Sequence, residues 1–264
     1  MSKLAVLVPF LAAYAIAFTT QSLADQRNHH PGTFRILGGK VAPTGAYPFM
    51  VSLRSYPNEH FCGGTIVNNL WVLTAAHCMA GKSMESIFAV VGTNTLNFGG
   101  LAVEVHKIVI HPDYNNTGYE SNDIAMIQLD SALSYSATIA PVTLDTAVSQ
   151  STIHVTVVGW GETRNKGPPS NNLRELSTQT LSQAACSLYW SDQFNADQIC
   201  TKFQSEKGFC HGDSGGPLIY TNSKTQVGIA SFSFRGGCGK MFPDVFGRVS
   251  SYVSWIQSTV NSQG

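Results

Sequence analysis

The turn Gly212-Asp213-Ser214-Gly215-Gly216, which Pro217 follows, is the feature that most constrains what this chain can fold into. It places a serine beside an acid in a turn hinged by glycines. A serine hydroxyl is a weak nucleophile and needs a neighbouring base to take its proton. The position of that base along the chain separates the folds that use such a turn.

The turn also fits the pattern G-x-S-x-G, the nucleophile elbow of α/β-hydrolases, in which an acid and then a histidine follow the serine. All eight histidines of this chain precede Ser214. The α/β-hydrolase interpretation therefore fails. The order that remains is histidine, then aspartate, then serine.

The segment Thr74-Ala75-Ala76-His77-Cys78 contains the best candidate for the base, because its small residues let the chain turn tightly beside the imidazole. Asp123 is the candidate acid, and it begins an apolar run to Leu129 that predicts a buried strand. Burying an unpaired carboxylate is costly, so Asp123 needs a partner, and an imidazole N–H is a suitable one.

Local patterns predict strands before the base and one helix at the C-terminus. Two short strands are expected at Gly63–Val67 and Trp71–Leu73, joined by a turn at Asn68-Asn69. Residues 249–260 predict a helix, because Val249, Val253, Ile256 and Val260 fall on one face. We expect this helix to pack on the outside of the C-terminal half of the fold.

Six segments together resemble the chymotrypsin-like (trypsin-fold) serine proteases, in that family's order and spacing. They are Ile36–Gly39, Phe61–Gly64, Thr74–Cys78, Asn122–Leu129, Gly159–Gly161 and Gly212–Pro217. The resemblance runs from Ile36 to about Val260. It implies an all-β fold of two six-stranded antiparallel β-barrels with a C-terminal α-helix, and a serine endopeptidase that needs no cofactor.

The resemblance also assigns roles to the candidate catalytic residues. Ser214 would be the nucleophile and His77 the general base, while Asp123 orients the imidazole and stabilises its charged form. The backbone amides of Gly212 and Ser214 would form the oxyanion hole. Ser231 would hydrogen-bond the acid of the triad.

Residues 1–35 are expected to be removed from the mature protein. Lys3, the apolar run from Leu4 to Phe18 and the small residues Ser22 and Ala24 predict a signal peptide over residues 1–24, and hence secretion. Residues 25–35 would be an activation propeptide, and residues 36–264 the protease domain, with its two lobes meeting near residues 140–155.

The family resemblance makes Arg35 an activation site. A trypsin-like protease would cut after Arg35, and the new amine of Ile36 would pair with Asp213 and order the oxyanion hole.

Six cysteines, an even number, favour an oxidising compartment. Six cysteines allow fifteen pairings, and the sequence alone does not choose among them. The resemblance implies one of these pairings: Cys62–Cys78, Cys186–Cys200 and Cys210–Cys238. No closely spaced pair of cysteines supports a zinc site instead.

The charge pattern predicts few partners beyond protein substrates. The full chain has a net charge of zero, and no basic stripe favours nucleic acid or a membrane surface. We expect a monomer that meets protein or peptide substrates, an activating trypsin-like protease and protein inhibitors. No metal is expected, and Asn115 begins a weakly specific glycosylation sequon.

Residues that align with the family's primary substrate pocket predict the side chain that is accepted before the cleaved bond, called P1. A trypsin carries Asp where this chain has Gly208, and Asp244 stands where most relatives have Gly. This pair resembles arthropod chymotrypsins and crab-collagenase-type enzymes of broad specificity. Phe209 and Ser233 add bulk, and Phe232 replaces the usual Trp.

We therefore expect cleavage after Phe, Tyr, Leu or Met, with weaker activity after basic or small residues. A digestive enzyme of the gut lumen is the simplest role. Two alternatives stay open: a catalytically silent homologue that serves as a binding or regulatory module, and a processing protease of narrow specificity.

Overall fold

A computed structural model describes residues 36–115, 120–147 and 152–262. The predicted signal peptide, the whole predicted propeptide with Arg35, and the remainder of the Asn115 sequon lie outside the described residues. Among the described residues, no helix is long and apolar enough to cross a membrane.

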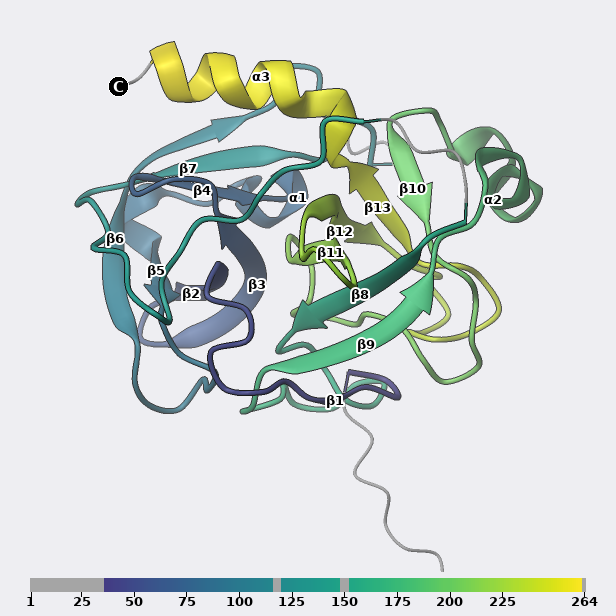
Figure 1. The fold of residues 1–264 in the computed structure, drawn as a ribbon, viewed down its shortest axis with the longest axis horizontal. Helices are drawn as coiled ribbons and strands as arrows, with labels where there is room; N and C mark the ends of the chain where they lie inside the picture. The colour runs from purple at the N-terminus through teal and green to yellow at the C-terminus, as the bar shows by residue number, and fades with distance from the viewer. Residues whose placement is uncertain (1–35, 116–119, 148–151, 263–264) are drawn as a thin grey trace, which may run out of the picture. The chain divides into compact units, whose positions relative to one another are not determined.

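Six strands of the N-terminal half form a closed antiparallel barrel, seen at the left of Figure 1. Around the barrel their order is β2-β3-β4-β7-β6-β5. Their bounds are Met50–Ser55 (β2), Glu59–Ile66 (β3), Trp71–Thr74 (β4), Ile87–Val91 (β5), Leu101–Ile110 (β6) and Ala125–Leu129 (β7). The predicted strands at 63–67 and 71–73 are confirmed, and the Asn68 side chain accepts the amides of Leu70 and Trp71 in the turn between them.

The C-terminal half forms an open sheet of seven strands, in the order β1-β9-β8-β11-β12-β13-β10. The chain reaches this half in the segment between β7 and β8. The strands are Lys40–Val41 (β1), His154–Gly159 (β8), Arg174–Gln179 (β9), Gln198–Cys200 (β10), Pro217–Tyr220 (β11), Gln226–Phe232 (β12) and Val245–Arg248 (β13).

The expectation of a second closed barrel is therefore wrong. The ends of β9 and β10 approach each other, but only one isolated bridge, Thr180 to Thr201, joins them. Strand β10 has only three residues, and the chain turns away into helix α2 (Gln183–Trp190) directly after that bridge. A full ladder between β9 and β10 has no room to form.

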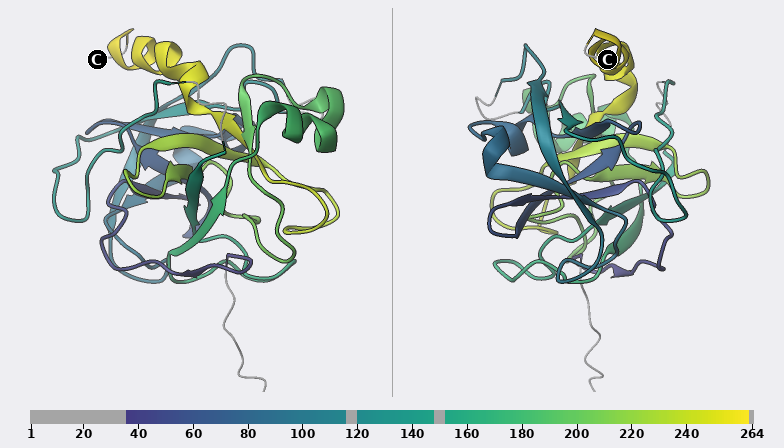
Figure 2. Two further views of the ribbon diagram at one scale, coloured as in Figure 1. Left: turned by 45° about the vertical axis from the view of Figure 1, so that its right-hand side comes forward. Right: turned by 90° about the vertical axis from the view of Figure 1, so that its left-hand side faces the viewer.

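The predicted C-terminal helix is present as α3, Val249–Ser262. Val249, Tyr252 and Ile256 are buried in the same core cluster as the barrel residues, and Val253 and Val260 pack against that cluster. The helix thus packs against both halves, because that cluster holds barrel residues and Ile229 of β12, and α3 also contacts β12 of the C-terminal sheet as expected. Figure 1 shows the helix above β7, and Figure 2 shows it from two further sides. The remaining helices are α1 (Ala76–Met79) and two short 3-10 turns, η1 (Met84–Ser86) and η2 (Ser191–Gln193).

Three disulfides join Cys62 to Cys78, Cys186 to Cys200 and Cys210 to Cys238. This is the pairing that the family resemblance implies. The first ties β3 to α1, the second ties α2 to β10, and the third ties the segment before Ser214 to the loop before β13.

The barrel core supplies the first testable prediction. Ile127 on β7 is wholly buried and is paired with Val72 and Ile108 on the neighbouring strands. Ile127→Ala should lower the free energy of unfolding by about 2–5 kcal/mol, because it leaves a cavity in a packed core. Urea unfolding measures this. Val41→Ala, at a half-exposed site on β1, should change it by less than about 0.5 kcal/mol, and equal losses would contradict the proposed packing.

Candidate active site

His77 and Asp123 are brought together by the pairing of two antiparallel strands. Thr74, the last residue of β4, lies opposite Ala125, the first residue of β7. His77 follows β4 by three residues and Asp123 precedes β7 by two, so both project from the same end of the barrel. Asp123 Oδ1 accepts the His77 backbone amide at 2.8 Å, and Asp123 Oδ2 lies 2.7 Å from His77 Nδ1.

Asp123 is buried but fully hydrogen-bonded. Its Oδ2 also accepts the hydroxyl of Ser231, on β12 of the C-terminal sheet, at 2.5 Å. The Asp123 side chain is 1% exposed, whereas that of His77 is 25% exposed. Because Nδ1 of His77 faces the carboxylate, Nε2 is the nitrogen left for a reacting group.

Burial alone would lower the pKa of His77. The charge and hydrogen bond of Asp123, together with the charge of Glu120, oppose burial and raise the pKa of His77 above its ordinary value. Glu120 accepts the Tyr114 hydroxyl at 2.7 Å. Glu120 could not be predicted from the sequence, since one acid in a loop carries no pattern of its own.

The turn that carries Ser214 packs against the segment that leads to His77. The Gly63 amide donates to the Ser214 carbonyl at 2.8 Å, and the Gly215 amide donates to Ala230 at 2.8 Å. A Cβ on Gly215 would clash with the Thr74 hydroxyl and lie 3.1 Å from the Ala75 nitrogen. This close approach joins the serine turn to the segment that carries His77. Among the described residues no hydrogen bond joins Ser214 to His77, and such bonds often tighten only with substrate.

Two backbone amides of the turn are left unused. Within the described part of the chain, the amides of Gly212 and Ser214 donate no hydrogen bond, whereas those of Asp213, Gly215 and Gly216 all do. Gly212 adopts φ +94°, a conformation that favours glycine. The turn therefore presents two free donors next to the serine, as an oxyanion site requires.

A second histidine, His60, which no sequence pattern indicated, binds the backbone of this turn. His60 Nε2 lies 2.9 Å from the Gly212 carbonyl, and His60 Nδ1 lies 2.9 Å from Ser52 Oγ. Because Arg54 Nε donates to Ser52 Oγ, the Ser52 proton is directed to Nδ1, and Nε2–H donates to Gly212. Burial lowers the pKa of His60 to about 4, which keeps the ring neutral.

Asp213 is wholly buried, and backbone amides bind both of its carboxylate oxygens. Gly161 N donates to Oδ1 at 2.7 Å and Cys210 N donates to Oδ2 at 2.9 Å. Burial raises the pKa of Asp213 to about 7 despite these bonds. Ile36 is also wholly buried.

The residues expected to form the primary pocket fall into separate groups in the structure, and Phe209 lies in the core instead of lining a pocket. Asp244 is buried against Gly208, and its Oδ2 accepts the Phe209 amide at 2.9 Å. The Phe209 ring is buried in the core of the C-terminal sheet, 5.2 Å from the ring of Phe246. Ser231 binds Asp123.

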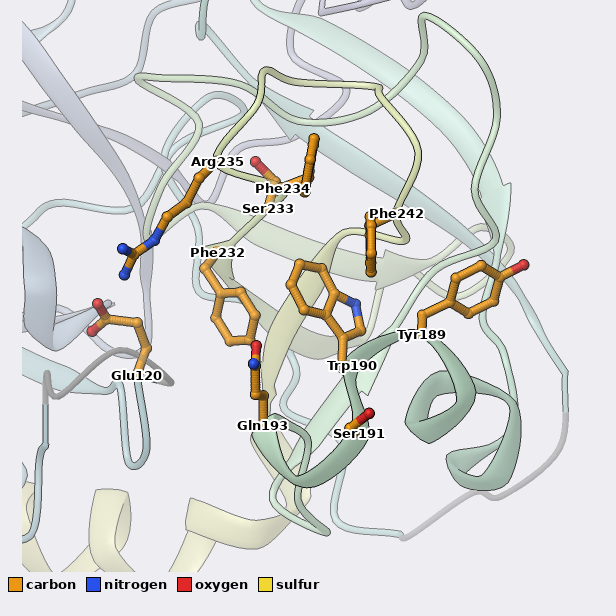
Figure 3. A pocket seen from close by; sticks show the side chains of 10 residues that line it. All are labelled: Glu120, Tyr189, Trp190, Ser191, Gln193, Phe232, Ser233, Phe234, Arg235 and Phe242. Atoms are coloured by element: carbon orange, nitrogen blue, oxygen red, sulfur yellow. The ribbon is translucent and has the colours of Figure 1, made fainter.

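An aromatic hollow of about 650 Å³ lies beside these residues, and Phe232 and Ser233 line it. Trp190 is among the aromatic residues that line it, and the centroid of its ring lies 5.2 Å from that of Phe232 and 5.0 Å from that of Phe242. Figure 3 shows the charged ends of Glu120 and Arg235 turned toward each other at its open side.

Three groups of side chains lie close enough to hold a metal ion, judged within the described ranges. Two of them include cysteines that form disulfides, and a disulfide sulfur is not the thiolate that a metal binds. The third is His77, Glu120 and Asp123, but both oxygens of Asp123 already accept hydrogen bonds.

The folded arrangement combines a closed β-barrel that carries His77 and Asp123 with an open β-sheet that carries Ser214. The family model described as Trypsin matches residues 36–256. Chymotrypsin-2 of Vespa crabro is 36% identical over 224 residues, which cover 84% of this chain and 98% of that protein. Granzyme M of Homo sapiens (36% identical, covering 84% and 88%) and trypsin 5G1 of Aedes aegypti (35% identical, covering 84% of each) are similarly related. The chain therefore belongs to the trypsin family of serine endopeptidases.

The contact between the serine turn and the base segment makes a prediction about activity. Gly215→Ala should lower kcat/KM by about 100-fold, because the new methyl group displaces Ser214 relative to His77. Gly81→Ala is the matched control, since Gly81 has a similar positive φ but nothing within 4 Å of an added Cβ. Peptide hydrolysis by the activated protein measures both. Equal losses in the two variants would show that the contact does not matter.

Glu120 makes a prediction about pH. Its charge helps to raise the pKa of His77, and the base is active only when neutral, so activity falls as pH drops through that pKa. Glu120→Gln should therefore move the acid limb of the kcat/KM profile to lower pH. Glu85→Gln, at an exposed site, should leave the limb in place. An unchanged limb in Glu120→Gln would refute this role.

Proposed function

We propose that this chain is the secreted zymogen of a serine endopeptidase of chymotrypsin-like to broad P1 preference that works through an acyl-enzyme. The observation that carries the proposal is the hydrogen-bonded series Ser231–Asp123–His77, set against a serine turn with two free amides. These contacts support His77 as the base and the Ser214 turn as the oxyanion site.

In the proposed reaction, Ser214 Oγ attacks the substrate carbonyl carbon while His77 Nε2 takes its proton. The carbonyl oxygen becomes an anion that the amides of Gly212 and Ser214 stabilise, a contribution of about 2.7–4 kcal/mol for one donor. The imidazolium, held by Asp123, then gives its proton to the leaving amine. Water repeats the sequence on the acyl-enzyme and frees Ser214.

Activation would follow a cut after Arg35. The support is the state of Asp213, a wholly buried carboxylate held only by amides, with a pKa raised to about 7. A buried carboxylate gains most from a cation, and the freed amine of Ile36 would supply one. This pairing would fix the turn that holds Ser214.

The P1 preference rests on the pocket residues. The related chymotrypsin, granzyme and trypsin share similar identity with this chain, so their names do not decide between specificities. Gly208 has no side chain, the ring of Phe209 is buried in the core, and the carboxylate of Asp244 lies against Gly208. We expect cleavage after Phe, Tyr, Leu and Met, with weaker cleavage after basic residues, in a digestive setting.

One experiment tests both the activity and the activation. The full chain, cut after Arg35 by a trypsin-like protease, should react with a fluorophosphonate probe at Ser214 and cleave a P1 peptide library after large apolar residues. Arg35→Gln should stay uncut and unlabelled, and Ser214→Ala should be cut but unlabelled. A cut wild-type chain that takes no label would instead be a silent homologue. Exclusive cleavage after Arg and Lys would overturn the P1 proposal, and cleavage of very few sequences would indicate a processing protease.

A further inference from the structure

Two buried carboxylates bind consecutive amides just before the serine turn. Phe209 N donates to Asp244 Oδ2 at 2.9 Å, and the next amide, Cys210 N, donates to Asp213 Oδ2 at 2.9 Å. Asp244 is 6% exposed and Asp213 is 1% exposed. Two adjacent amides of one short segment therefore bind two buried carboxylates.

The two acids differ in their partners. Both oxygens of Asp213 accept amides, whereas Oδ1 of Asp244 accepts no hydrogen bond from the described residues. In the part of the chain that the structure describes, Arg54 Nη2 is the only fully buried side-chain nitrogen or oxygen without a partner. Oδ1 of Asp244 therefore keeps some accessible surface, beside the small hollow that Asp244 and Gly208 line.

No cation among the described residues neutralises Asp244. Lys202 and Lys207 line the small hollow beside it, but both are exposed and neither forms an ion pair with it. Asp213 is the other charged group nearby, and Gly208 adds no side chain. Burial raises the pKa of Asp244 to about 7; the Phe209 amide opposes this shift and the charge of Asp213 adds to it.

We infer that the protonation state of Asp244 decides which P1 side chain the enzyme accepts. This inference rests on the proposed function. Neutral Asp244 admits an apolar side chain without burying a charge. Ionised Asp244 has no cation partner, and an arginine or lysine side chain of the substrate would supply one. An apolar side chain would instead bury the unpaired carboxylate, which costs binding free energy. Asp244 is thus a specificity-determining residue that switches with pH.

The test compares two peptides that differ only in Arg or Leu at P1, across a pH range on both sides of the pKa of about 7. The quantity is the ratio of kcat/KM for Arg to kcat/KM for Leu. Groups of the free enzyme that act on both peptides alike, such as His77 and the Ile36 amine, cancel in this ratio. The ratio should rise with pH by up to about tenfold per unit and level off above the titration.

Asp244→Asn keeps the shape and the acceptor for Phe209 N but does not titrate, so its ratio should not change with pH. Asp130→Asn, at an exposed site, should keep the wild-type rise. A flat wild-type ratio overturns the inference whether or not the variant folds, and so does a rise that survives in Asp244→Asn. Failure to cleave either peptide would instead count against the proposed function.

Discussion

The carboxylate of Asp123 is the group on which the rest of the site depends. It accepts hydrogen bonds from both the backbone and the ring of His77, which belong to the closed barrel, and from Ser231, which belongs to the open sheet. A buried carboxylate tolerates few arrangements other than full hydrogen bonding. Its burial therefore ties the closed barrel to the open sheet and fixes the ring of His77 through Nδ1.

Much of this arrangement could be predicted from the sequence, because it follows from local patterns. The apolar run after Asp123 indicated a buried strand, and the turn at Asn68 indicated its neighbour. The repeat of Val249, Val253 and Ile256 indicated a helix. That pattern shows that one face is buried, but not what buries it, and it did not reveal that the helix packs on the N-terminal barrel as well as on β12. Likewise, strand patterns do not tell whether the last ladder of a sheet closes.

The residues that the sequence did not reveal act through single contacts between distant parts of the chain. His60 contacts Gly212 across 152 positions. The sequence indicated Asp244 as a pocket residue, but not its contact with Phe209 across 35 positions. Neither contact repeats with a period, and neither residue type is unusual by itself. The role of Glu120 is of the same kind, because it depends on which loop lies near His77. Such roles follow from tertiary structure alone.

The unequal closure of the two sheets gives the fold an uneven local stability. The barrel that carries His77 and Asp123 has every strand paired on both sides, so local opening there must break whole ladders. The sheet that carries Ser214 is completed by one bridge, between Thr180 and Thr201. Hydrogen exchange would therefore penetrate the second half first. The base therefore lies on the closed barrel, whereas the nucleophile and its oxyanion turn lie on the half whose sheet stays open.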